Sequence, residues 1–369
     1  GGEPGLITDT RLDLFQIREE RALREEEANQ YASWNRDRGI RLSNRTRLRL
    51  GDAGRLSLTL SAHHQQQQSY FQELKSSGAM PFTDRLTEGR ATGRFIQGSY
   101  LSQLDLQGRP WLIYGRFEGD VTTSRLGFDH ELRGGMELRR EWNGGEGYTF
   151  DLDRPPQVSF NGVDGFQRPR PFDEIPTLAT TAFYVDDRMS RTLPGARLLR
   201  IQAGARLDVL HDGGRVTDAR DLVLQPRVSA ELGVTEWLRL RTGWGRAAKT
   251  PPLRMLYPAP DYYDLVNVNH YTNDPAERLA VLTTFIEDPT NPDLGFSMAD
   301  KTEVGIELGL GGSAVSIVAY HEELLGAVGL HPEPSYLLRD RYALEEAAPG
   351  EPPRVLEPPV GADTVPILV

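Results

Sequence analysis

The sequence contains no cysteine and only seven histidines in 369 residues. The absence of cysteine excludes disulfide bonds and thiolate ligands for a metal ion. His63 and His64 are adjacent, but neighbouring side chains on a strand point to opposite faces, so the two rings are not expected to share one ion. We therefore expect no metal site and no cofactor.

The short motifs of common enzyme classes are also missing. The chain has no Gly-x-Ser-x-Gly elbow, no phosphate loop ending in Gly-Lys-Ser/Thr and no His-Glu-x-x-His. Carboxylate pairs occur, but a chain with 53 acidic residues contains such pairs by chance. We expect no catalytic residues and no enzymatic activity.

No run of about 18 apolar residues is present, so the sequence offers no candidate transmembrane helix. The mean hydropathy of −0.48 fits a soluble protein, yet a membrane β-barrel also gives a low value because its strands alternate lipid-facing and interior side chains. The chain starts with Gly1 instead of methionine and has no export signal. We expect a fragment whose export signal lies upstream.

Acidic residues exceed basic ones, and the formal net charge is −11 at pH 7. Binding to nucleic acid through phosphate neutralisation needs the opposite balance, so no nucleic-acid partner is expected. A glutamate-rich run over residues 18–27 has helix-forming composition and predicts a solvated loop helix.

Alternation of apolar and polar side chains with period two is the strongest pattern present. From Leu199 to Val209 every odd-numbered residue is apolar, whereas the even-numbered ones include Arg200 and Arg206. Such alternation indicates a strand with two different faces. About ten strands of the length that crosses a bilayer are predicted. They cover residues 40–50, 55–65, 109–123, 129–142, 176–191, 197–210, 221–234, 236–247, 300–310 and 313–324.

The connections between these strands alternate strictly between short and long. The short ones include the turn-forming residues 51–54 (GDAG) and 311–312 (GG), and the long ones cover about 65–108, 143–175, 211–220 and 248–299. A membrane barrel has short periplasmic turns and long extracellular loops. The sequence thus predicts an all-β fold, a partial transmembrane antiparallel up-and-down β-barrel with long extracellular loops.

Three regions follow from this pattern. Residues 1–39 are predicted to be an extracellular loop or a truncated N-terminal part, residues 40–325 a partial outer-membrane β-barrel, and residues 326–369 a truncated extracellular loop. The last region is rich in proline and ends without a recognisable final strand.

Several segments resemble TonB-dependent receptors, the ligand-gated importers of the Gram-negative outer membrane. Residues 130–141 (HELRGGMELRRE) are similar to a recurrent strand of that family, as is the pair formed by 184–188 (YVDDR) and 202–208 (QAGARLD). Residues 243–252 (GWGRAAKTPP) are followed by 291–294 (NPDL) and 301–308 (KTEVGIEL), in the order found in the family. Gly295 and Phe296 replace the usual Pro-Glu after this leucine.

The resemblance implies energised uptake of a scarce solute, such as a siderophore, cobalamin or an oligosaccharide, across the outer membrane. It implies TonB as a partner, reached through an N-terminal plug and TonB box. It also implies contact with outer-membrane lipid and, as a further partner, a surface lipoprotein. One alternative is a passive porin or channel of similar architecture. The other is a soluble extracellular β-protein that binds glycans or mediates adhesion.

Aromatic and acidic residues gather in the long connection 248–299. One interpretation is a ligand site that stacks on a sugar or aryl group, and the other is a small core that the loop needs for its own folding. The second interpretation is favoured. The candidate ligand-binding residues are Tyr257, Asp261, Tyr262, Tyr263, Asp264 and Tyr271.

Arginines recur on the strand faces opposite the apolar residues. Because arginine at the lipid midplane costs about 2–4 kcal/mol, this face is predicted to be the lumen wall. The wall is either a basic path for an anionic solute or a set of partners for plug carboxylates, and the second is favoured. The residues are Arg200, Arg206, Arg239 and Arg241, with Arg45, Arg47 and Arg49 on the first strand.

Four tryptophans lie near predicted strand ends: Trp111, Trp142, Trp237 and Trp244. They indicate either an aromatic girdle at the headgroup level or the general enrichment of tryptophan in strands.

Overall fold

The computed structural model describes residues 5–21, 30–76, 78–96, 98–160, 163–195, 197–212, 221–291, 294–329 and 331–368. Nearly all of its regular structure is antiparallel sheet. None of the helices within these residues is long and apolar enough to cross a membrane.

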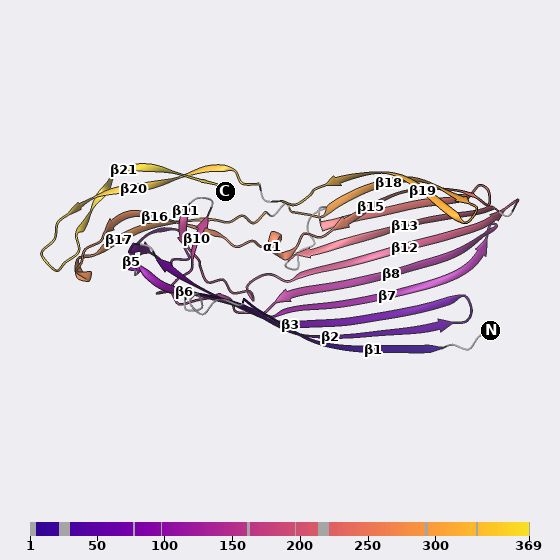
Figure 1. Ribbon diagram of the computed structural model, residues 1–369, viewed down its shortest axis with the longest axis horizontal. Coiled ribbons are helices and arrows are strands. Elements are labelled where there is room, and N and C mark those ends of the chain that lie inside the picture. The colour runs from indigo at the N-terminus through magenta and orange to yellow at the C-terminus, as the bar shows by residue number, and fades with distance from the viewer. Residues whose placement is uncertain are drawn as a thin grey trace.

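One large sheet dominates the structure (Figure 1). Its main strands follow one another in space in the same order as in the chain, and every neighbouring pair is antiparallel. This is the topology of an up-and-down barrel wall. The strands are β1 Leu6–Glu20, β2 Tyr31–Leu50, β3 Gly54–Ser76, β7 Pro110–Arg125, β8 Phe128–Asn143, β12 Leu178–Leu193, β13 Arg197–Asp212, β14 Leu222–Gly233, β15 Leu238–Lys249, β18 Ser297–Leu310 and β19 Ser313–Leu325.

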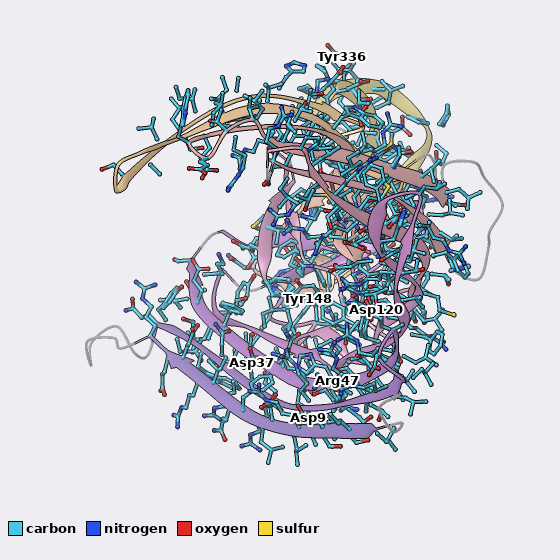
Figure 2. The ribbon with its side chains drawn as sticks, turned by 90° about the vertical axis from the view of Figure 1, so that its right-hand side faces the viewer. Asp9, Asp37, Arg47, Asp120, Tyr148 and Tyr336 are labelled. Carbon is cyan, nitrogen blue, oxygen red and sulfur yellow. The ribbon has the colours of Figure 1, made fainter. Side chains whose placement is uncertain are left out.

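The sheet curves into an open trough, which Figure 2 shows nearly end-on. On β7, Trp111 and Phe117 are exposed on the convex face, whereas Arg116 and Asp120 line the concave face. Because side chains on a strand alternate in direction, the sheet presents apolar side chains outwards and charged ones inwards. β1 and β19 form the two edges, since neither has a second neighbour among the described strands.

All ten predicted strands are present. Eight of them lie within three residues of their predicted bounds, whereas β2 begins nine residues before its predicted start and β3 ends eleven residues after its predicted end. The loop alternative for residues 1–39 is wrong for residues 6–20 and 31–39, which form β1 and the start of β2. Ile7 and Phe15 lie on the same face of β1 as Asp9 and Asp13, so this strand lacks the alternation that marks the others. The predicted helix over 18–27 is wrong for residues 18–20, which end β1, and residues 22–29 lie outside the described ranges.

The tight turns lie together at one end of the sheet (Figure 1). Leu126 and Gly127 connect Arg125 to Phe128 with φ values of 53° and 78°. Two positive φ values define a type I′ turn, whose twist matches that of the flanking strands. This end of the sheet therefore has the short, closely wound connections that the sequence predicts.

The long connections meet at the opposite end and fold into a cap (Figure 1). Two of them share one small sheet, in the order β16-β17-β5-β4. β6 (Ser99–Gly108) and β9 (Gly147–Thr149) continue the main sheet beside β3. The other cap elements are β4 Met80–Phe82, β5 Gly89–Ile96, β10 Gln157–Phe160, β11 Val163–Phe166, α1 Leu253–Leu256, β16 Asp261–His270, η2 Pro275–Glu277, β17 Leu279–Glu287, β20 Pro334–Glu345 and β21 Arg354–Leu368.

Most of residues 326–369 forms the β20–β21 hairpin, so this region ends in a strand that the sequence pattern did not reveal. The hairpin lies over the small cap sheet: Asn267 on β16 donates a hydrogen bond to the carbonyl of Asp340 at 2.9 Å, and Arg90 on β5 pairs with Glu357. These contacts make the hairpin part of the cap.

Two buried apolar clusters stabilise the cap and its junction with the sheet. The first lies within the cap and contains Phe82, Ile96, Tyr100 and Phe166. The second lies where strand ends meet α1 and contains Leu178, Leu210, Val223, Leu256 and Phe296. The long connections are thus packed structure and not loose loops.

Candidate functional site: the concave wall and the cap

The concave face of the sheet bounds a pocket of about 1160 Å³. Nine cationic and seven anionic residues line it, so its charge is nearly balanced. The ion pairs on this face decide which of these charges remain without a partner.

A network centred on Tyr184 of β12 crosses the middle of the wall. The Tyr184 hydroxyl donates to Glu118 of β7 at 2.8 Å and accepts from the Nε of Arg116 at 3.0 Å. Arg116 also pairs with Glu118. Glu137 of β8 accepts from Arg206 of β13 at 2.8 Å. Four strands are therefore connected by side chains as well as by the backbone.

Asp186 occupies a second junction, two residues further along β12. Its carboxylate accepts from the guanidinium of Arg227 on β14 at 2.8 and 3.0 Å and from the amide of Gln202 on β13 at 2.9 Å. Gly204 makes room for it, because a Cβ at this position would lie 2.5 Å from the Asp186 carboxylate. Because Asp186 is only 8% exposed, its carboxylate is stabilised mainly by the hydrogen bonds from Arg227 and Gln202.

The predicted wall arginines of β13 and β15 lie on this concave face, and three of these four are paired across strands. Arg200 and Arg239 both pair with Glu231, at 3.1 and 3.3 Å, and Arg239 also reaches Glu307. Arg206 pairs with Glu137, and Arg241 packs over Gly305, where an added Cβ would lie 2.6 Å from its Nε. The carboxylates that neutralise the paired arginines come from the wall itself.

The arginines of β2 differ. Arg49 lines the pocket, and Arg45 and Arg47 lie on the same face by alternation. No ion pair joins these three to a carboxylate among the described residues, and the Nε of Arg47 is buried without a hydrogen-bond partner there. The wall arginines without an ion pair among the described residues are therefore Arg45, Arg47 and Arg49 of β2 and Arg241 of β15.

A buried ion pair lies at the centre of the cap. Arg168 and Asp264 are 4% and 5% exposed, and their Nη2 and Oδ2 atoms are 2.6 Å apart. Arg168 also donates to the carbonyls of Arg85 and Phe166, and Asp264 accepts from the hydroxyl of Thr284. Arg168 therefore joins three long connections that lie far apart in the sequence.

The six candidate ligand residues of the cap are placed very differently from one another. Tyr263 is 1% exposed and donates to the carbonyl of Leu368, and Asp264 belongs to the buried pair. Tyr257 packs against the cluster at the sheet junction. The guanidinium of Arg168 covers the ring of Tyr262 at 5.1 Å. These four side chains are part of the cap interior.

Tyr271 is the most accessible of the six, with half of its surface exposed. Its ring contacts Phe95 edge-on at 5.1 Å and lies 4.3 Å from the guanidinium of Arg278. Asp261 begins β16 directly opposite Glu287. Burial, and then the charge of Glu287, raises the pKa of the Asp261 carboxyl.

The two adjacent histidines point to opposite faces, as their spacing predicts. His63 contacts Phe15 on the concave side, with ring centroids 5.8 Å apart, and His64 stacks on Trp111 on the convex side at 4.2 Å. Within the described ranges no group of three potential ligands lies close enough to hold a metal ion.

Three of the four predicted girdle tryptophans lie at strand ends. Trp111 and Trp142 stack on each other at the cap end, with centroids 5.9 Å apart, and Trp237 lies in a tight turn at the other end. Trp244 lies in the interior of β15 and is not at a strand end.

Sequence reasoning missed the residues with the densest contacts, Arg168, Tyr184 and Asp186. Tyr184 and Asp186 lie in residues 184–188, which carry the family resemblance, so the sequence marked this segment without assigning a role to either residue. Arg168 follows the buried Phe166 in an irregular connection, and its partner Asp264 is 96 residues away. No local pattern marks such a pair.

Comparison with known proteins identifies a family. The TonB dependent receptor-like, beta-barrel family model matches residues 7–335. No curated protein matches the chain.

Among solved structures, the RagAB peptide importer in the "closed-closed" state aligns with a TM-score of 0.49 and 13% identity over 80% of this chain and 31% of that one. The siderophore receptor PirA from Pseudomonas aeruginosa aligns with a TM-score of 0.39 and 14% identity over 97% and 58%. The ferric-catecholate import receptor Fiu from K12 E. coli gives 0.45 and 9% over 84% and 47%. This chain thus spans 31–58% of the length of these three proteins. On the family match, which covers most of its residues, the chain belongs to the TonB-dependent receptor-like β-barrel family.

Proposed function

We propose that the chain forms the wall and outer cap of an outer-membrane receptor that takes up a scarce solute with energy supplied through TonB. The observation that carries this proposal is that the two ends of the main sheet differ in structure. Short turns lie at one end of a curved sheet and a packed cap lies at the other, above a charged concave pocket. A solute caught at the cap would have a polar route along the wall.

The dimensions of the convex face support placement in the outer membrane of a Gram-negative bacterium. Exposed apolar side chains on β7 run from Trp111 to Val121. Ten residues at about 3.3 Å each span roughly 33 Å. A tilt of about 40° reduces this to about 25 Å, the height of the apolar band of a membrane barrel.

Solute recognition is proposed for the cap, with Tyr271 as the principal aromatic contact at one end of β16 and Asp261 as an acidic contact at the other end. Loops on a rigid scaffold are the usual place for variable recognition. Tyr257, Tyr263 and Asp264, by contrast, would support the site by holding the cap together. The proposed solutes are a siderophore, cobalamin or an oligosaccharide.

The proposed partners are TonB, through a plug and TonB box elsewhere in the protein, and outer-membrane lipid. The unneutralised arginines of β2, Arg45, Arg47 and Arg49, would meet carboxylates of the plug or of an anionic solute. A surface lipoprotein over the cap is proposed as a further partner.

Uptake in cells tests the proposal. Cells making the full-length receptor would be given radiolabelled ferric catecholate, cobalamin or maltodextrin, with and without functional TonB. We expect TonB-dependent accumulation of one of the three, and loss of that accumulation in a Tyr271→Ala receptor that reaches the outer membrane in normal amount. Accumulation that persists without TonB would indicate a passive channel instead.

A further inference from the structure

A row of stacked rings crosses the convex face at the cap end of the sheet. His64 of β3 stacks on Trp111 of β7 at 4.2 Å and 21°, and Trp111 stacks on Trp142 of β8 at 5.9 Å and 6°. The three residues are direct partners in the strand register. On β2 and β3, Trp34 stacks on Tyr70 in the same way at 5.8 Å.

Three arginines accompany these rings on the same face. Arg36 lies 4.4 Å from the ring of Trp34, and Arg140 lies 5.5 Å from the ring of Trp142. Arg38 is exposed one step along the same face of β2. We call Arg36, Arg38 and Arg140, together with the stacked rings, the cap-side belt.

The belt arginines face no carboxylate within 4 Å among the described residues. The nearby acid Glu20, which is opposite Trp34 in register, is already paired with Arg18 at 2.7 Å. The Nε of Arg36 is buried without a hydrogen-bond partner in the described part of the chain. By contrast, Arg139, the neighbour of Arg140 on the opposite face, is paired with Glu141 at 3.0 Å.

The belt lies at the border of the apolar surface. Towards the turn end, the next outward side chains on β2 are Ile40 and Leu42, and those on β7 and β8 include Ile113 and Leu138, all of them at least 42% exposed. Positive charges with unused donors therefore lie immediately beyond a lipid-facing band. This is the level of headgroups, where tryptophan and tyrosine also gather.

We propose that the cap-side belt binds the phosphate groups of anionic lipid in the membrane leaflet next to the cap. A guanidinium matches phosphate with two parallel hydrogen bonds, and its stacking on an aromatic ring fixes its position. The outward face of the belt and its continuity with the apolar band favour a lipid over a soluble anion. The inference rests on the membrane placement proposed above.

Fluorescence quenching by brominated lipid tests this directly. The full chain, with Trp237→Phe and Trp244→Phe so that only belt tryptophans remain, is reconstituted into vesicles of phosphatidylcholine. Equal fractions of dibrominated phosphatidylcholine or dibrominated phosphatidic acid are then introduced. The ratio of quenching gives the relative binding constant of the anionic lipid at the belt.

We expect phosphatidic acid to bind preferentially, and each of Arg36→Gln, Arg38→Gln and Arg140→Gln to lower the preference by about fivefold, which corresponds to about 1 kcal/mol per basic side chain at a membrane surface. Arg139→Gln is the matched control on the opposite face and should leave it unchanged. Inorganic phosphate in the buffer should not compete.

The outcomes separate the two proposals. Strong quenching by both lipids without preference would leave the membrane placement intact and overturn lipid binding at the belt. Loss of the preference in added inorganic phosphate would point to a soluble-anion site and would also overturn it. Absence of quenching by either lipid would overturn the membrane placement and the belt proposal together.

Discussion

The guanidinium of Arg168 lies 2.6 Å from the carboxylate of Asp264 in the cap, and both side chains are almost completely buried. Burying two charges is costly, and the cost is offset only when further hydrogen bonds satisfy them. Here the carbonyls of Arg85 and Phe166 and the hydroxyl of Thr284 supply those bonds. The pair therefore joins the connection that contains Arg168 to the two connections that share the small cap sheet.

Removing one partner should open the cap and leave the sheet intact. Arg168→Ala strands the buried carboxylate of Asp264, and we expect a loss of about 3–5 kcal/mol in local stability. Hydrogen exchange would report this as faster exchange in β5, β11 and β16. Arg188→Ala, which breaks an exposed pair with Glu131, should cost less than about 1 kcal/mol. If these cap strands were equally protected from hydrogen exchange in the two variants, the Arg168–Asp264 pair would not hold the cap together.

The strands of the main sheet could be predicted from the sequence where their two faces differ in polarity. β13 was predictable because Leu199 to Val209 alternate with polar residues, and that alternation is imposed by two different solvents on its two faces. β1 was missed because Ile7 and Phe15 share the concave face with acids, so the period is absent. The sheet was therefore predictable wherever its two faces differ in polarity.

The cap was not predictable in the same way. β5 and β17 pair across nearly 190 residues, through partners such as Gly93 and Ala280. Gly93 is needed there because a Cβ would lie 2.6 Å from the carbonyl of Phe82, but nothing near Gly93 in the sequence reveals that neighbour. For the six cap candidates, composition gave the aromatic cluster, but only the packing separates the buried Tyr263 from the exposed Tyr271.

Tyr263 and Tyr271 should respond oppositely to truncation. Tyr263→Ala removes a fully buried ring, and we expect a loss of about 3–5 kcal/mol in cap stability, measured by hydrogen exchange or limited proteolysis. Tyr271→Ala removes a half-exposed ring and should leave cap protection nearly unchanged, while solute accumulation by the full-length receptor is lost. If Tyr271→Ala opened the cap as much as Tyr263→Ala, its proposed role in recognition would be lost.

Gly147 should be intolerant of any side chain. It adopts a φ of 77°, and a Cβ there would lie 1.8 Å from the backbone carbonyl of Arg170. Gly147→Ala should therefore break the adjoining Tyr148–Arg170 bridge and cost more than about 1 kcal/mol. Gly144→Ala, three residues earlier with open space around it, is the control and should be neutral. Denaturant unfolding of both variants would decide the point.

The wall arginines should divide into two functional groups. Arg239 is neutralised by Glu231 and Glu307, whereas Arg47 has no carboxylate partner among the described residues. We expect Arg47→Gln to change the ratio of anionic to neutral solute uptake by the full-length receptor more than Arg239→Gln does. A larger effect of Arg239→Gln would mean that its pairing does not screen it from the solute.

The stability of the β16–β17 hairpin should depend on pH through Asp261. The pKa of this carboxyl is raised by burial and by Glu287, its direct cross-strand partner. The folded hairpin therefore binds the proton more tightly than the unfolded chain, and stability rises as pH falls from neutral through the raised pKa.

The charged form of the Asp261 carboxyl is disfavoured first by its burial and then by Glu287, since like charges opposite each other on adjacent strands repel. Asp261→Asn should accordingly stabilise the hairpin by up to about 1 kcal/mol at pH 7 and lose this advantage in acid. Hydrogen exchange of β16 at both pH values, with the exposed Asp173→Asn as control, measures the difference. Stabilisation of equal size at both pH values would show that the amide acts through packing and not through the removal of charge.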